Sequence, residues 1–220
     1  MAVEPGYAQR GEVLLIQFAR EPQIGRVKTR MMPFLSAAQA CRLHSDLTLW
    51  TTRQLLASAL GPVEVIVAGD TSHALFKQCQ SLGVKAVRQQ CGADLGQRMY
   101  NSLRDALTRY QSVILVGSDC PGIDTAYLSK AVQALQRSTV VIGPATDGGY
   151  VLIGARAIDE AIFRGISWGS DQVYASTVNV LQTVCVDWEA LPCLSDIDRP
   201  EDLTVWETVN GGAKIPDTPG

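Results

Sequence analysis

The chain has few of the residues that build zinc, redox or membrane-spanning sites. Its 220 residues include only two histidines, His44 and His73, and six cysteines, none of which form a C-x-x-C pair. Neither a zinc site nor a dithiol site is therefore expected. No apolar run approaches the ~20 residues that span a bilayer, and residues 1–13 lack the apolar core of a signal peptide. These absences predict a reducing, cytoplasmic compartment and no membrane partner.

Excess charge of either sign and the standard nucleotide fingerprints are also missing. Lys and Arg number 19 and Asp and Glu 22, which gives a net charge of −3. Such a balance offers no electrostatic reason to expect nucleic acid as a partner. Neither G-x-x-x-x-G-K nor G-x-G-x-x-G occurs, so a Walker A loop and a dinucleotide fingerprint are excluded. The length suits one domain, with a core over residues 12–209 and a flexible tail over 210–220. Nothing in the sequence indicates an oligomeric state.

Short apolar runs alternate with helical patterns along the chain. Strands are predicted at residues 13–19, 63–68, 84–88, 113–116, 139–143, 150–153 and 184–186. Helices are predicted from Ser36, which forms a capping box with Gln39, and from Asp94, with an apolar face of Leu95, Met99, Leu103, Ala106 and Tyr110. Further helices are predicted at residues 71–81, 124–136 (with Asp124 as its cap), 157–164, 170–182 and 200–209. This alternation predicts an α/β sandwich with a mostly parallel sheet that is antiparallel around residues 139–154.

The loop that follows the first strand, residues 20–30 (REPQIGRVKTR), carries Arg20, Arg26, Lys28 and Arg30. A basic loop at the carboxyl end of a strand suits a diphosphate, because Arg gives bidentate contacts and Lys a point charge. The alternative is an ordinary solvated loop.

Two carboxylates are candidates for a metal site. Asp119 follows the strand at 113–116, and strand ends of this kind are where open α/β sheets bind ligands. Asp198 lies in residues 195–203 (SDIDRPEDL). The alternative for both is a capping role at a turn or helix. If the two converge, they favour an oxygen-ligated ion such as Mg²⁺ or Mn²⁺.

Residues 143–150 (GPATDGGY) place Asp147 before two glycines, Gly148 and Gly149, and an aromatic residue, Tyr150. Glycines let a backbone approach a ligand closely, whereas Asp-Gly alone is typical of a hairpin turn. Arg98 can reach a substrate from its helix or lie in solvent. Trp168 can stack on a sugar or base, or pack within the protein.

Taken together, these motifs resemble the bacterial DUF2064 family over about residues 12–205. The family is described as glycosyltransferase-like and is related to nucleotidyltransferases of molybdenum-cofactor and coenzyme F420 synthesis. The resemblance implies a three-layer nucleotide-diphospho-sugar transferase (GT-A-like) fold with a divalent metal at Asp119 and Asp198. It also implies a phosphate-side loop at Arg26, Lys28 and Arg30, and an acceptor-side motif at residues 147–150.

The leading hypothesis is a metal-dependent glycosyltransferase with a nucleoside-diphosphate sugar donor and a small-molecule acceptor. Asp147 is its catalytic candidate, for positioning or deprotonating the acceptor hydroxyl. Acceptor contacts are expected at Gly148, Gly149, Tyr150 and Trp168. Nucleotide or phosphate contacts are expected at Arg20, Gly25, Arg26, Lys28, Arg30, Asp94, Arg98 and Ser118. One alternative is a nucleotidyltransferase that joins a nucleoside monophosphate to a phosphorylated acceptor. Another is a noncatalytic nucleotide-binding module.

Overall fold

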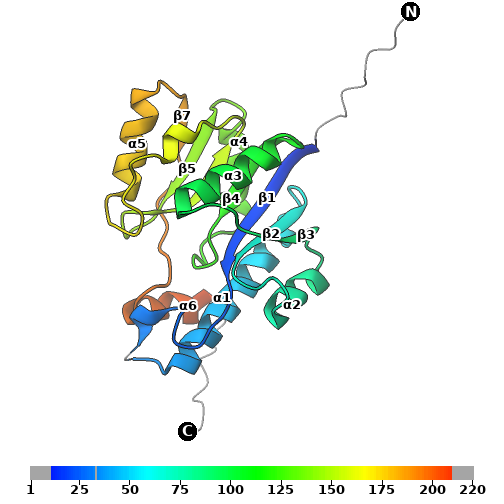
Figure 1. Ribbon diagram of the computed structural model, residues 1–220, viewed down its shortest axis with the longest axis vertical. Coiled ribbons are helices and arrows are strands. Elements are labelled where there is room, and N and C mark those ends of the chain that lie inside the picture. Colours follow the sequence, from blue (N-terminus) through cyan, green and yellow to red (C-terminus); the bar gives the residue numbers. More distant parts are fainter. Residues whose placement is uncertain (1–10, 33, 210–220) are drawn as a thin grey trace, which may run out of the picture.

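The computed structural model describes residues 11–32 and 34–209, and within them the chain forms a seven-stranded sheet covered by helices (Figure 1). The strands are β1 Gly11–Arg20, β2 Val63–Ala68, β3 Ala86–Gln89, β4 Tyr110–Val116, β5 Val140–Pro144, β6 Tyr150–Ala155 and β7 Trp188–Ala190. Their spatial order is β3-β2-β1-β4-β6-β5-β7. β6 pairs antiparallel with both β4 and β5, and the other pairings are parallel. The prediction of a mostly parallel sheet with an antiparallel part is confirmed.

Helices cover both faces of this sheet. They are α1 Ala37–Ala57, α2 Ala74–Leu82, α3 Leu95–Leu107, α4 Thr125–Ala134, α5 Val173–Thr183 and α6 Leu203–Val209. One buried cluster joins the sheet to α1, α2 and α4, and a second joins its other face to α3 and α5. Alternate residues of β1 supply the two cores, with Leu15 in the first and Leu14 in the second. This division arises because successive side chains of a strand point to opposite faces.

A third, smaller core fastens the end of the chain to α1. α6 packs on α1 between Ala40 and Trp50, and the rings of Trp50 and Trp206 meet edge-on with centroids 5.8 Å apart. A short 3₁₀ helix at Thr29–Met31 adds Met31 to this core, and another at Pro200–Asp202 directly precedes α6. This packing places the segment before α6 close to the loop after β1. Among the described residues, no helix is both long and apolar enough to cross a membrane.

Local signals placed several helix boundaries correctly. Ser36 forms the expected capping box with Gln39 at the start of α1. Asp94 and Asp124 cap α3 and α4 through bonds from backbone N–H groups. The prediction that Tyr110 belongs to the face of α3 is wrong, because α3 ends at Leu107 and Tyr110 begins β4.

Other elements also differ from the sequence-based expectation: the helix expected at 200–209 begins as a 3₁₀ helix at Pro200–Asp202, and the strand expected at 84–88 is β3. α2 begins at Ala74 rather than residue 71, because the Asp70 carboxylate accepts bonds from Ser72 and holds a turn there. The helix expected at 157–164 shrinks to a 3₁₀ helix at Glu160–Phe163, and α5 begins at Val173 rather than residue 170. No strand forms at 184–186, because Cys185 adopts a left-handed backbone conformation (φ 53°). The corresponding strand is β7, and the expected tail at 210–220 lies outside the described residues.

Candidate functional site

A cleft opens along the edge where β1, β2, β4 and β5 end and where antiparallel β6 begins. It has three adjoining parts, with volumes of about 640, 510 and 160 Å³, and Gly117 lines all three. Gly117 directly follows β4 and has open space around it, since a Cβ there would meet nothing within 4 Å. We refer to the 510 Å³ part as the basic cavity and to the 640 Å³ part as the acidic cavity. The cleft lies where ligands bind in open α/β sheets.

Lys28 is the most deeply buried cation of the basic cavity. This residue has a left-handed backbone (φ 50°), and its side chain is only 2% exposed. Its Nζ donates a 2.5 Å hydrogen bond to the carbonyl of Ile197 and lies 3.0 Å from Oδ1 of Asp119. The loop after β1 is therefore tied at once to the end of β4 and to the segment before α6. A buried ammonium with such ties is poorly explained by a solvated basic loop.

Asp119 and Asp198 converge on this cavity, which is the arrangement that a shared ion would need. Ile197 N–H donates to the carbonyl of Asp119 at 2.8 Å, which brings Asp198 to within one residue of that contact. Both carboxylates line the basic cavity. Asp198 Oδ2 forms an ion pair with Arg30 Nη1 at 2.5 Å. The motif after β4 and the motif near the C-terminus thus form one wall, although about 80 residues separate them.

The other predicted phosphate-side residues divide into two groups. Arg20, Arg26 and Arg98 line the basic cavity together with Lys28 and Arg30. Gly25 does not line it; this glycine supplies a left-handed turn (φ 77°) in the exposed loop. Asp94 is also absent from the lining, and its carboxylate caps α3 by accepting from Gln97 N–H at 2.8 Å. For Asp94 the structure thus shows the capping role.

Ser118 lines the basic cavity, but its hydroxyl is committed to the protein. It donates to the carbonyl of Phe18 at 2.8 Å and accepts from the amide of Gln17 at 2.9 Å. Gln17 is fully buried and also accepts a 2.7 Å bond from Thr52. Because its hydroxyl hydrogen is already used, Ser118 holds the ends of β1 and β4 together rather than donating to a phosphate.

His44 is a residue of this cavity that the sequence analysis missed. It is buried on α1, and its Nε2 lies 2.9 Å from the carbonyl of Arg20. Burial lowers the pKa of His44, against a smaller raising effect of Asp119. A neutral ring with Nε2–H donating to Arg20 fits both facts. The sequence signal was weak, because a lone histidine on a helix face gives no indication of the strand end that it meets.

The turn between β5 and β6 carries Asp147 into the cleft. Asp147 Oδ1 accepts a 2.9 Å bond from Gly149 N–H, and both residues line the acidic cavity and the 160 Å³ part. Gly148 lines neither; its φ is 88°, and a Cβ there would fall 2.0 Å from the carbonyl oxygen of Asp171. Glycine therefore serves a different purpose at each of the two positions. Gly149 leaves room in the cleft, whereas Gly148 is needed by the packing of the turn against residue 171.

An aromatic wall borders the acidic cavity. Trp168 and Tyr150 meet edge-on with ring centroids 6.4 Å apart, and both line the cavity. The indole also packs on α3, since a Cβ on Gly96 would fall 2.7 Å from it. Trp168 therefore packs within the protein and also presents surface to the cleft, and its stacking on a sugar or base stays a prediction. Burial raises the pKa of Tyr150, so its phenol stays protonated at neutral pH.

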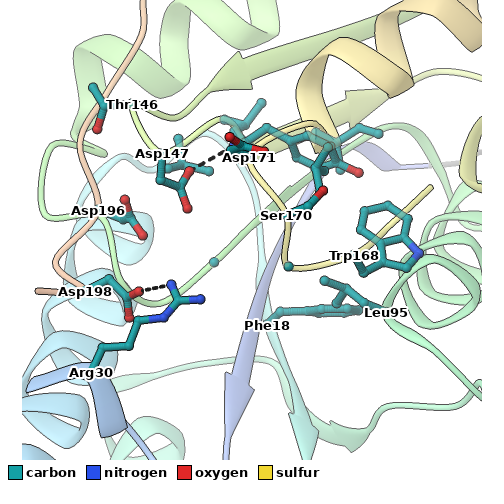
Figure 2. A pocket seen from close by; sticks show the side chains of 18 of the residues that line it. Phe18, Arg30, Leu95, Thr146, Asp147, Trp168, Ser170, Asp171, Asp196 and Asp198 are labelled. Atoms are coloured by element: carbon teal, nitrogen blue, oxygen red, sulfur yellow. Dashed lines mark hydrogen bonds and ion pairs between the residues drawn. The ribbon is translucent and has the colours of Figure 1, made fainter. Parts of the chain in front are cut away.

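Asp196 is the second residue that the sequence analysis missed. It lines the acidic cavity and the 160 Å³ part together with Asp147. Burial, and then the nearby charge of Asp147, raises the pKa of Asp196 to about 6. The sequence feature that could have indicated Asp196 is its spacing of two residues from Asp198, because side chains two apart in an extended segment point to the same side. Figure 2 shows Asp147, Asp196 and Asp198 along one side of the cavity.

The site fits a divalent cation only with help from a substrate. Among the described residues, no three His, Cys, Asp or Glu side chains group as a metal cage. However, Asp119 Oδ1 is buried and, apart from its ion pair with Lys28, has no hydrogen-bond partner. Burial raises the pKa of the neighbouring Cys120 to about 12, so no thiolate competes. Two carboxylates without further ligands suit Mg²⁺, which usually keeps several waters and binds substrate phosphates.

The sequence pattern of the family described as "Uncharacterized protein conserved in bacteria (DUF2064)" matches residues 51–170. No curated protein matched the chain. A solved structure from Desulfovibrio desulfuricans G20, described as a "putative nucleotide-diphospho-sugar transferase", is 30% identical. It has a TM-score of 0.82 over 93% of this chain and 90% of that chain.

More distant solved structures share the fold alone. A cytidylyltransferase from Leptospira borgpetersenii serovar Hardjo-bovis is 14% identical, with a TM-score of 0.61 over 94% of this chain and 90% of its own. A CMP:2-keto-3-deoxy-manno-octonic acid synthetase in complex with CTP is 11% identical, with a TM-score of 0.58 over 91% and 99%. The expected nucleotide-diphospho-sugar transferase-like fold is confirmed.

Proposed function

This chain belongs to the DUF2064 family, and we propose that it is a divalent-metal-dependent glycosyltransferase that uses a nucleoside-diphosphate sugar. The observation that supports this most is the cleft itself, in which a cavity lined by five cationic side chains adjoins a cavity lined by carboxylates and aromatic rings. The first suits a diphosphate and the second an acceptor that gives up a proton. Gly117, between them, leaves room for the reacting sugar.

In this proposal the basic cavity binds the donor. Lys28 and Arg30 neutralise the diphosphate, together with Arg20, Arg26 and Arg98 from the rim. Asp119 and Asp198 would hold a Mg²⁺ or Mn²⁺ ion, which when bound supplies positive charge to the leaving diphosphate. The buried ties of Lys28 keep its ammonium in place before the substrate arrives. Such preorganised charge is the main source of stabilisation for a developing anion.

Asp147 is the proposed general base. Its carboxylate is oriented by Gly149 N–H, so it needs no rearrangement to face an acceptor. It takes the proton of the acceptor hydroxyl while that oxygen bonds to the anomeric carbon. The nucleoside diphosphate leaves with the electron pair of the broken bond. Asp196, beside it, adds a second carboxylate to the same wall.

The test is nucleoside diphosphate release from a panel of nucleotide sugars, with Mn²⁺ or Mg²⁺ and a mixture of small hydroxylated acceptors. We expect nucleoside diphosphate to be released only when both the metal and an acceptor are present. Pyrophosphate release from a nucleoside triphosphate, with no release from any sugar donor, would contradict it. Metal-independent nucleotide binding without turnover on any donor would support the noncatalytic module instead.

The nucleotidyltransferase alternative is favoured by two observations. Five cations are enough for a triphosphate, and the fold is shared with a synthetase solved with CTP. In that case the acceptor would be a phosphate ester, which must then bind in the acidic cavity. The charge of that cavity therefore bears directly on the choice.

A further inference from the structure

The two large parts of the cleft carry opposite charge. In the part of the chain that the structure describes, the basic cavity is lined by five Arg or Lys residues and two carboxylates. The acidic cavity has two guanidiniums, Arg30 and Arg199, against six carboxylates: Asp147, Asp171, Asp196, Asp198, Glu201 and Asp202. Arg30 is already paired with Asp198 at 2.5 Å. The uncompensated charge facing the acidic cavity is therefore strongly negative.

The acidic cavity is also two-sided. In Figure 2, Phe18, Leu95 and Trp168 lie across the cavity from Asp147 and Asp196. The apolar side is unusually open for such residues, since Leu95 is 42% exposed although it belongs to the face of α3. A volume of about 640 Å³ is within the range of small-molecule sites. A ligand that fills it meets apolar surface on one side and carboxylate oxygens on the other.

Carboxylates restrict what such a ligand can be. An ionised carboxylate accepts hydrogen bonds and donates none, so its partners must be hydroxyl, amine or ammonium groups. A phosphate would place further negative charge beside six carboxylates that only two guanidiniums offset. Repulsion of this kind selects substrates as effectively as attraction does.

Building on the proposed function, we infer that the acceptor is a neutral or cationic molecule with hydroxyl or ammonium donors and an apolar face, and that it carries no phosphate. The two cavities then have different roles. The basic cavity binds the diphosphate of the donor, and the acidic cavity excludes phosphorylated molecules that would compete with the acceptor. The inference also separates the two candidate reactions, since it disfavours transfer to a phosphate ester.

The test measures binding to the acidic cavity without any donor. Three probes that differ mainly in charge are titrated near neutral pH: glucose, glucosamine and glucose 6-phosphate. The readout is the quenching of Trp168 fluorescence, obtained by subtracting the signal of Trp168→Phe from that of the wild type. Glucosamine is expected to bind most tightly and glucose 6-phosphate most weakly, with the two differing by about tenfold or more at low salt. The difference should shrink as salt is added.

A charge-removing variant sharpens the result. Asp171→Asn combined with Glu201→Gln should cut the preference for glucosamine over glucose 6-phosphate several-fold. Its matched control is Asp105→Asn with Glu207→Gln, which changes net charge equally but lies outside the cleft lining, and it should leave the preference unchanged.

Two outcomes would overturn the inference: glucose 6-phosphate binding as tightly as glucose, or no Trp168-dependent quenching by glucosamine. Neither depends on turnover, so a failure to release nucleoside diphosphate would count against the proposed function alone.

Discussion

The basic and acidic cavities share a wall but are built differently. The basic cavity lies on the ends of parallel strands, and its inner polar residues are buried: Lys28, His44 and Ser118 are less than a tenth exposed, whereas the arginines at its rim are exposed or half-buried. The acidic cavity lies on the β5–β6 turn and on the segment after β7, where Asp147 is exposed and Asp196 is half-buried. Changes in the first should therefore disturb binding and folding together, whereas changes in the second should act mainly on the acceptor.

The largest effect is expected for Asp119→Asn. Losing this charge removes the proposed metal ligand, so nucleoside diphosphate release should fall about 1,000-fold, within the range of lost transition-state electrostatics. The control is Asp124→Asn, because Asn caps α4 as well as Asp does and activity should not change. A D119N protein that kept its metal-dependent turnover would remove Asp119 from the role.

On the acidic side, Asp147→Asn should lower turnover about 100-fold, as expected when a general base is lost. Donor binding should be unchanged, because the donor occupies the other cavity. Comparing the Kd for nucleoside diphosphate with the turnover rate separates the two. Weaker nucleotide binding in D147N would show that the cavities do not divide the substrates as proposed.

The loop after β1 and the β5–β6 turn can be compared in stability, because each contains a glycine with positive φ, Gly25 and Gly148. Gly148→Ala would place a Cβ 2.0 Å from the carbonyl oxygen of Asp171, whereas Gly25→Ala meets nothing within 4 Å. Both substitutions introduce backbone strain of about 1 kcal/mol, and only Gly148→Ala adds a backbone clash. We therefore expect the free energy of unfolding to fall by at least about 2 kcal/mol in G148A. Urea unfolding measures both. Equal losses would mean that the turn does not depend on residue 171.

The smallest effect is a pH dependence from His44. Its pKa is lowered in the folded protein by burial, so the unfolded chain takes up a proton first as the pH falls below about 6.5. His44 therefore contributes stability that is present above this pH and is lost below it.

The measurement for His44 is the free energy of unfolding of the wild type minus that of His44→Gln, followed as the pH is lowered through about 6.5. The difference is needed because the raised pKa of Asp196 acts in the opposite direction in acid. A difference that did not change with pH would contradict burial as the cause.

Local patterns explain why much of the fold was predictable. The capping box of Ser36 and Gln39 and the caps of Asp94 and Asp124 depend on residues within one turn, and all three formed. The strand expected at 184–186 failed because a short apolar run does not reveal the left-handed Cys185 that ends it.

The sequence predicted which residues lie at the site better than it predicted what each of them does there. The cations of residues 20–30, Asp119 and Asp147 all reach the cleft, whereas Ser118 and Asp94 serve the protein's own backbone. No spacing rule distinguishes a hydroxyl that binds phosphate from one that joins two strand ends, since the difference lies in Phe18, 100 residues away.

The sequence by itself determined the alternation of strands and helices, the helix caps and the positions of the charged motifs, because these depend on neighbours along the chain. Only the tertiary structure decided that the motif after β4 and the motif before α6 form one wall, that Lys28 is buried between them, and that cations and carboxylates separate into adjoining cavities. The physical reason is that charge and burial at the cleft arise from contacts between segments far apart in sequence, which the packing of α6 on α1 and the pairing of β6 with β4 bring together.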